Sequence, residues 1–249
     1  MQILCTNDDG YLALGIRVLA SAARNLGQVT IVAPDREQSA TSHSLTLHHP
    51  LRARRSTDGA LVVDGTPTDC VILAVNELME PRPDICLSGV NHGPNMGEDV
   101  LYSGTVAAAM EATVIGIPAV AISYTGDADE GIEAWESVLV RLLEGILKQD
   151  KLPPDTLFNV NLPRVDPADV KGIRVTSLGK RRYSDSLTRA LDPSGREYYW
   201  IGGGEITWSG AVDSDFGAVH EGYISVTPLH LDLTNYSLLE EIRGWQLSL

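Results

Sequence analysis

Short apolar runs alternate with amphipathic segments along the first two thirds of the chain. The apolar runs predict buried strands at residues 1–5, 29–33, 84–88, 119–124 and 157–161. The amphipathic segments predict helices at residues 14–26, 67–77, 105–115 and 135–147. Residues 45–54 and 60–63 read as extended segments joined by a turn at residues 56–59. Strands that alternate with helices in this way predict an α/β fold with a mostly parallel, doubly wound sheet, which the strand at residues 157–161 closes.

The last third of the chain has a different pattern. Strands are predicted at residues 173–177 and 223–227, and the segment between them carries Tyr198, Tyr199, Trp200 and Trp208 around a run of three glycines at residues 202–204. Such a segment is typical of a β-hairpin or a long excursion. Its aromatic side chains fit either ordinary packing or a subunit interface. We therefore expect one domain over residues 1–249, with its core at about 1–178 and a C-terminal extension at about 179–249.

Composition narrows the range of partners. The chain has 249 residues, 43% hydrophobic residues and a net charge of −14, and its one dense basic cluster is Lys180, Arg181 and Arg182. A general nucleic-acid-binding protein needs many Lys and Arg contacts with phosphates, so no nucleic-acid polymer is expected as a partner. A small phosphorylated substrate remains compatible, because a bound metal can supply local positive charge.

Targeting signals and membrane-spanning runs are missing from the pattern. No charged N-terminal region precedes a long apolar segment, and no apolar run reaches membrane-spanning length. The cysteines Cys5, Cys70 and Cys86 are scattered in apolar contexts and form no CxxC pair. Buried free thiols suit a reducing compartment, so we expect a cytoplasmic protein with no membrane partner.

The first candidate for chemistry is the turn Asn7-Asp8-Asp9-Gly10, directly after the first predicted strand. Adjacent carboxylates repel each other, and each raises the pKa of the other unless a positive charge lies between them. A bound divalent cation is the simplest such charge. A turn that contains Asp and Gly only for their backbone geometry is an equally good interpretation of the local sequence.

Two further loops leave the same edge of the predicted sheet. Residues 35–39 follow the second strand, and residues 88–95 include the end of the next one. The carboxyl ends of parallel strands meet at one edge, so these loops can converge with Asp8 and Asp9 on a single site. Their donors are carboxylate, hydroxyl and amide oxygens, a set that favours Mg²⁺, Mn²⁺ or Ca²⁺ over Zn²⁺.

A possible anion seat lies at the start of the helix predicted from Thr105. Small hydroxyl residues and a glycine at a helix N-terminus leave free N–H groups and the positive end of the helix dipole. A plain N-cap is the alternative interpretation of Tyr102-Ser103-Gly104-Thr105. If phosphate binds there, Gly104→Val should block it while metal affinity stays nearly intact.

These motifs together resemble the stationary-phase survival protein E (SurE) family of metal-dependent 5′-nucleotidases, also described as acid phosphatases. The resemblance covers nearly the whole chain and includes these segments: Asn7-Asp8-Asp9-Gly10, Ala33-Pro34-Asp35-Arg36 with Ser39, Gly65-Thr66-Pro67-Thr68-Asp69-Cys70, Ser88-Gly89-Val90-Asn91 with Gly93-Pro94-Asn95, residues 102–111, and Glu221-Gly222-Tyr223. Each motif is weak alone, but the ordered set is highly specific.

The resemblance implies a Rossmann-like core whose C-terminal excursion assembles a homodimer or homotetramer. It also implies one divalent cation per subunit, Mg²⁺ or Mn²⁺ above all, at Asp8, Asp9, Ser39 and Asn91. By the same resemblance, the substrate phosphate would be surrounded by Asn95, Ser103, Gly104 and Thr105.

The expected function is hydrolysis of nucleoside 5′-monophosphates, with 3′-monophosphates left open. Asp8 and Asp9 are the candidate catalytic residues, and the nucleophile is either a metal-activated water or an Asp carboxylate. Two alternatives from other classes remain: a metal-dependent glycosyltransferase that uses a nucleotide sugar, and a non-catalytic nucleotide sensor.

Overall fold

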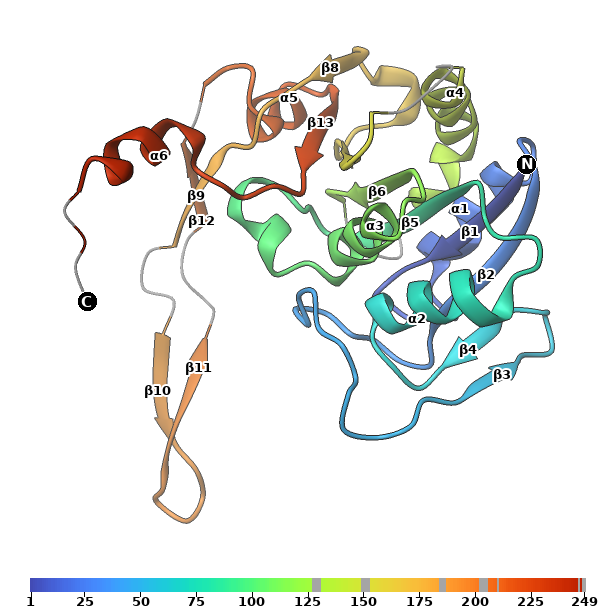
Figure 1. Cartoon of the computed structure of the whole chain (residues 1–249), viewed down its shortest axis with the longest axis horizontal. Helices are drawn as coiled ribbons and strands as arrows, with labels where there is room; N and C mark the ends of the chain where they lie inside the picture. Colours follow the sequence, from blue (N-terminus) through green and yellow to red (C-terminus); the bar gives the residue numbers. More distant parts are fainter. Residues whose placement is uncertain are drawn as a thin grey trace.

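A mixed sheet of nine strands forms the centre of the molecule (Figure 1). The computed structural model describes residues 1–126, 131–148, 153–183, 187–201, 206–209, 211–245 and 247. The strand order is β3-β4-β2-β1-β5-β6-β7-β13-β8. The strands span Gln2–Thr6 (β1), Gln28–Pro34 (β2), Ala53–Arg55 (β3), Leu61–Val63 (β4), Ile85–His92 (β5), Ala119–Tyr124 (β6), Thr156–Leu162 (β7), Ile173–Val175 (β8) and Ile224–His230 (β13).

The pairing is parallel from β4 through β7, and again between β13 and β8. Only β3 with β4 and β7 with β13 pair antiparallel in this sheet. The mostly parallel α/β sheet predicted from the sequence is therefore confirmed in a mixed form. It does not close at β7, however, because β13 and β8 extend it.

Helices cover both faces of the sheet. The α-helices of the described residues span Leu14–Ala23 (α1), Pro67–Leu73 (α2), Gly104–Val114 (α3), Glu136–Leu147 (α4), Asp215–His220 (α5) and Tyr236–Arg243 (α6), and α6 lies away from the sheet (Figure 1). One apolar core joins α1 and α4 to alternate strand residues such as Ile3, Leu87 and Ile122. A second core joins α2 and α3 to the residues between them, such as Leu4 and Cys86. Side chains alternate across a strand, so the central strands β1, β2, β5, β6 and β7 each supply both cores.

Several predicted boundaries are wrong for local reasons. The extended segment at residues 45–54 forms a strand only at Ala53–Arg55. The helix at residues 14–26 ends at Ala23, where the side-chain amide of Asn25 binds the carbonyls of Ser21 and Ala22. Strand β5 continues past Ser88 to His92, because a register shift lets Asn91 pair with Ser123 of β6.

Two predicted helices change type within their length. The helix at residues 67–77 begins with the predicted Thr66 cap, in which the Thr66 hydroxyl accepts from Asp69 N–H, but it becomes a π-helix at Ala74–Leu78. The helix at residues 135–147 begins at Glu136, after a 3₁₀ turn at Ile132–Trp135.

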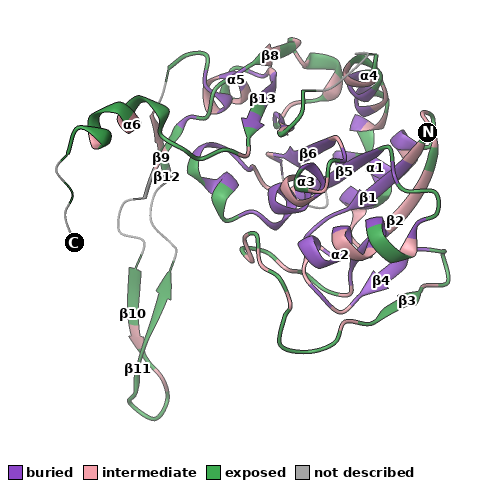
Figure 2. Cartoon of the chain, in the orientation of Figure 1, coloured by how far each residue is buried: buried purple, intermediate pink, exposed green. Residues whose placement is uncertain are grey.

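An antiparallel excursion projects between β8 and β13, and we call residues 180–209 the arm. Strand β9 (Lys180–Tyr183) pairs with β12 (Ile206–Ser209), and β10 (Leu187–Leu191) pairs with β11 (Glu197–Ile201). The hairpin β10–β11 extends away from the body, and its side chains are largely exposed (Figure 2). The predicted hairpin excursion is therefore present, while the triple glycine at residues 202–204 lies outside the described residues.

One buried carboxylate fastens the base of the arm to the body. Asp215, at the start of α5, accepts hydrogen bonds from Gly97 N–H (2.9 Å), Gly179 N–H (2.8 Å) and Phe216 N–H (2.7 Å). These amides belong to the loop after β5, the segment that enters the arm, and α5 itself. Burial raises the pKa of Asp215, and the three amides act in the opposite direction.

Replacing Asp215 with Ala should therefore be costly. The change leaves the amides of Gly97 and Gly179 without their acceptor, and we expect the free energy of unfolding to fall by about 3 kcal/mol. Denaturant unfolding of Asp215→Ala measures this loss. The control is Asp192→Ala at the exposed hairpin turn, where a carboxylate also accepts backbone N–H groups but water can replace it. Equal losses in the two variants would contradict the anchoring role.

Candidate active site

A cavity of about 610 Å³ lies where β1, β2 and β5 end. Its lining residues come from the loops after β1 and β2, from the end of β5 and the segment that follows it, from the start of α3 and from the arm: Asp8, Ser39, Ala40, Asn91, His92, Pro94, Asn95, Asp99, Tyr102, Ser103, Arg181 and Ile201. Five of the eight residues predicted for the site line this cavity. Asp9 and Gly104 follow lining residues directly in the chain, and Thr105 donates hydrogen bonds to the lining residue Asp8.

Asp8 is held by the N-terminus of α3. Its carboxylate accepts a hydrogen bond from Thr105 N–H (3.0 Å), and a second from the Thr105 hydroxyl. Burial raises the pKa of Asp8, while the hydrogen bonds from Thr105 act to lower it. The positive end of the helix dipole favours a negative charge at this place. The amide of Thr105, expected from the sequence to be free for phosphate, therefore binds Asp8.

Gly104 leaves room for that carboxylate. A Cβ atom at Gly104 would lie 2.8 Å from Asp8 Cβ and 2.9 Å from Asp8 Oδ2, both closer than real Cβ contacts. A side chain at Gly104 must therefore displace Asp8. This contact weighs against the expectation that Gly104→Val spares metal affinity, because Asp8 is one of the predicted metal ligands.

Asp9 lies beside His92 at the end of β5. Asp9 Oδ2 accepts from His92 N–H (3.2 Å), and Asp9 Oδ1 lies 3.9 Å from His92 Nδ1. Burial, and next the charge of Asp8, raise the pKa of Asp9 to about 6, while His92 acts to lower it. The repulsion between adjacent carboxylates inferred from the sequence is therefore present in the fold.

Ser39 and Asn91 supply neutral oxygens. The loop that carries Ser39 is drawn to β1 by the hydrogen bond from Gln38 N–H to the Asp8 carbonyl (2.7 Å), and the Ser39 hydroxyl donates to Glu37 (2.7 Å). Asn91 donates its amide N–H groups to the carbonyls of His92 (3.1 Å) and Gly93 (2.9 Å). That leaves the oxygen Oδ1 of Asn91 as its acceptor, 3.3 Å from the Thr105 hydroxyl.

This donor set suits a hard divalent cation. Two carboxylates, one hydroxyl and one amide oxygen are ligands of Mg²⁺ or Mn²⁺, and adjacent carboxylates with raised pKa values gain from a positive charge between them. Within the part of the chain that the structure describes, no three His, Cys, Asp or Glu side chains gather in a manner that could hold a metal.

Ser103 acts as the N-cap of α3. Its hydroxyl accepts from Val106 N–H (3.1 Å), which is the capping interpretation that the sequence left open. The hydroxyl nevertheless lines the cavity, and a Ser hydroxyl that accepts one bond can still donate another.

Arg181 was not predicted as a site residue. It comes from β9 of the arm, forms an ion pair with Asp99, and lies over the Trp208 ring with its guanidinium carbon 5.3 Å from the ring centroid. The basic cluster at residues 180–182 was the one feature of the sequence that could have indicated Arg181 as a site residue. Nothing local linked that cluster to the loops after β1 and β5.

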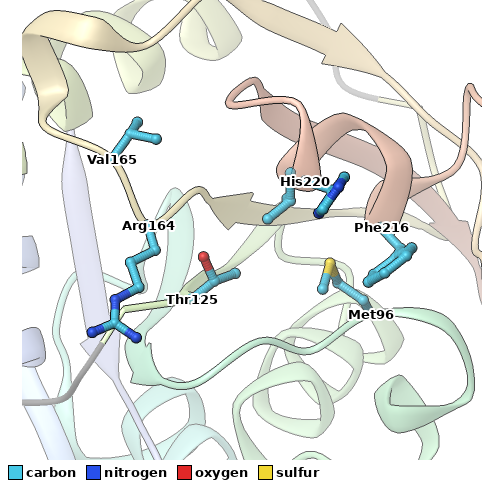
Figure 3. A pocket seen from close by; sticks show the side chains of 7 residues that line it. Met96, Thr125, Arg164, Val165, Phe216 and His220 are labelled. Carbon is cyan, nitrogen blue, oxygen red and sulfur yellow. The ribbon is translucent and has the colours of Figure 1, made fainter. Parts of the chain in front are cut away.

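A second pocket of about 300 Å³ lies past the ends of β6 and β7 (Figure 3). Its lining is mostly apolar and includes none of the predicted site residues: Met96, Thr125, Arg164, Val165, Phe216, Val219 and His220. Its lining shares no residue with the lining of the first cavity.

The fold and the larger cavity define an α/β protein whose oxygen-rich site suits a cation and a phosphorylated ligand. The model of the family described as "Survival protein SurE" matches residues 3–185. A relative from Gemmatimonas aurantiaca, named 5′-nucleotidase SurE, is 58% identical over 248 residues and 98% of each chain. One of the same name from Geotalea uraniireducens is 49% identical over 100% of each chain.

A solved structure agrees with the sequence relatives. The crystal structure of the SurE protein from Aquifex aeolicus superposes with a TM-score of 0.85, at 42% identity and over 98% of each chain. The chain therefore belongs to the SurE family, as its motifs indicated.

The raised pKa of Asp9 predicts how metal-free stability depends on pH. The folded state holds the Asp9 proton more tightly than the unfolded state, so the resulting stabilisation is present below about pH 4 and is lost as pH rises through about 6. In chelator at pH 7.5, Asp9→Asn should therefore raise the free energy of unfolding by about 2 kcal/mol. The gain should disappear at pH 4, and thermal unfolding at both pH values measures it. A variant less stable than the wild type at pH 7.5 would contradict the charge repulsion.

Proposed function

We propose that this protein is a metal-dependent phosphomonoesterase that releases phosphate from nucleoside 5′-monophosphates. The 5′-nucleotidase activity follows from membership of the SurE family, at 58% and 49% identity to relatives of that name over essentially the whole chain. The observation that supports the metal dependence is the convergence of Asp8, Ser39 and Asn91 on one cavity, with Asp9 beside them.

In this proposal, Asp8, Asp9, Ser39 and Asn91 hold one Mg²⁺ or Mn²⁺ ion. When bound there, the ion would supply positive charge that offsets negative charge on the phosphate oxygens. Asn95 and Ser103 line the same cavity and donate hydrogen bonds to the phosphate, while Gly104 and Thr105 support the seat from the helix behind it.

The hydrogen bonds of Asp8 bear on the nucleophile. Thr105 donates to both carboxylate oxygens of Asp8, and oxygens that accept such bonds are weaker nucleophiles. We therefore favour water as the nucleophile. Asp8 and Asp9 would then bind the metal ion and orient the water. Acid quenching during turnover with a ³²P-labelled substrate tests this, because attack by Asp would leave label on the protein.

The metal and the activity are tested together with a panel of 5′- and 3′-nucleotides and Mn²⁺. Phosphate release should be lost in thorough chelator and in Asp8→Asn, whereas Ser39→Ala, which removes a neutral ligand, should weaken metal binding less. Asp58→Asn, in an exposed turn away from the cavity, is the matched control. Full activity in chelator would overturn the metal proposal.

The same panel separates the two alternatives left open by the sequence. Sugar transfer from a nucleotide sugar would indicate a glycosyltransferase, and binding without turnover a nucleotide sensor. Relatives named as 5′-nucleotidases over the whole chain favour phosphate release.

We also propose a homodimer or homotetramer assembled through the arm. Its described strands expose Leu187, Leu191, Tyr198, Tyr199, Trp200 and Ile201, an apolar set that monomeric proteins rarely leave in water. The same rings are effective anchors between subunits. We place the protein in the cytoplasm, since its three cysteines are buried and free; no described helix has the length and apolarity to span a membrane.

Light scattering measures the assembly. The intact protein should have at least a dimer mass at micromolar concentration, and Trp200→Glu should shift it toward a smaller species. Val114→Glu on α3 is the control, because Val114 is 62% exposed and Trp200 is 65% exposed, but Val114 lies outside the arm. A monomeric wild type, or equal effects of both substitutions, would contradict assembly through the arm.

A further inference from the structure

Three buried polar side chains lie beneath the loop that follows β5. Ser123 belongs to β6, and Asn159 and Asn161 belong to β7; all three are completely buried. Unpaired polar groups in such an environment are costly, so buried amides are expected to have hydrogen-bond partners. Here the partner of all three is a single residue, Asn95.

Asn161 grips the backbone of Asn95 at two points. Its oxygen Oδ1 accepts from Asn95 N–H (2.9 Å), and its Nδ2 donates to the Asn95 carbonyl (3.0 Å). Asn159 Nδ2 donates to the same carbonyl (2.8 Å). A residue whose backbone N–H and carbonyl are both hydrogen-bonded has little freedom to move. Strand β7 therefore fixes the position of the loop after β5 at Asn95.

Ser123 fixes the side chain of Asn95. Asn95 Nδ2 donates to Ser123 Oγ (2.8 Å), and this bond selects one orientation of the amide. A carboxamide has two N–H donors and one carbonyl, so the bond with Ser123 leaves further hydrogen-bonding capacity in Asn95, which lines the large cavity.

Strand register connects this cluster to the proposed metal site. Asn91 is paired with Ser123 across β5 and β6, and Ser123 is paired with Asn161 across β6 and β7. These residues therefore lie in one row across three parallel strands. The row carries a proposed metal ligand at one end and the support of Asn95 at the other.

We infer that Ser123, Asn159 and Asn161 are positioning residues that hold Asn95 in the geometry for binding the substrate phosphate. They do so from the sheet below, without touching substrate. The inference rests on the proposed role of Asn95 at the phosphate. A hydrogen-bond donor that is already held in its binding orientation loses less conformational freedom when the ligand arrives, so a rigid support under Asn95 strengthens phosphate binding.

Ser123→Ala is the sharpest probe, because it removes one hydroxyl and leaves the backbone grip of Asn161 in place. Its matched control is Ser88→Ala on the neighbouring strand β5, where the buried hydroxyl has no hydrogen-bond partner among the described residues. Steady-state kinetics with AMP should show KM and the Ki of inorganic phosphate rising together, by about fivefold to tenfold, in Ser123→Ala only. Mn²⁺ affinity should remain within about twofold of the wild type.

Kinetic constants distinguish positioning from general support of the fold. Damage to the fold lowers the fraction of active enzyme, which reduces kcat and leaves KM and the phosphate Ki unchanged. That pattern in Ser123→Ala, or equal constants in Ser123→Ala and Ser88→Ala, would overturn the inference. Asn161→Ala should produce a larger rise in both constants, and thermal unfolding of each variant identifies the folded ones.

A double-mutant cycle tests whether Ser123 acts through Asn95. The double variant of Asn95→Ala and Ser123→Ala should be no worse than Asn95→Ala alone, since the side chain that Ser123 orients is then gone. Additive losses would overturn the inference. Normal kinetics in Asn95→Ala would instead show that Asn95 does not bind the substrate phosphate. The inference about Ser123, Asn159 and Asn161 would then fail with that proposal.

Discussion

The carboxylate of Asp8 at the N-terminus of α3 is the contact on which the site depends. It ties the turn after β1 to the start of a helix 97 residues further along the chain, through the amide and the hydroxyl of Thr105. The same hydroxyl lies 3.3 Å from Asn91 Oδ1. The turn after β1, the end of β5 and the start of α3 therefore meet at the side chain of Thr105. Gly104 has no side chain, so Asp8 can approach the start of α3 closely. This contact places Asp8 in the lining of the cavity.

The same contact sets the electrostatics. Helix α3 favours the charge on Asp8, while burial and, next, the charge of Asp8 disfavour the charge on Asp9, whose pKa rises to about 6. The fold thus keeps two acidic groups in a partly buried place where only a cation or a proton relieves their repulsion. The proposed metal binding and the expected pH dependence of metal-free stability therefore have one cause, the closeness of these two buried carboxylates.

Local patterns predicted those parts of the protein that depend on neighbouring residues in the chain. The end of β1 could be predicted because an apolar run stops at a turn that contains Asp8 and Asp9, and the capping signal at Thr66 predicted the start of α2. Partners far apart in the chain could not be found this way. Thr105 read as a free helix start, Arg181 as part of a surface cluster, and Asn161 as an ordinary strand residue. Their roles come from register and from the return of the arm, neither of which has a local signal.

The arm leaves and rejoins the body at one place. Strand β8 precedes it and β13 follows it, the two pair in parallel, and a bridge between Ser177 and Ser214 closes its base. The segment between Ser177 and Ser214 is a loop whose two ends are held together. Changing its length therefore changes the entropy of loop closure only slightly. The arm can therefore differ in length or sequence, and any contact with a partner that it makes can differ with it, while the sheet that carries the carboxylates keeps its form.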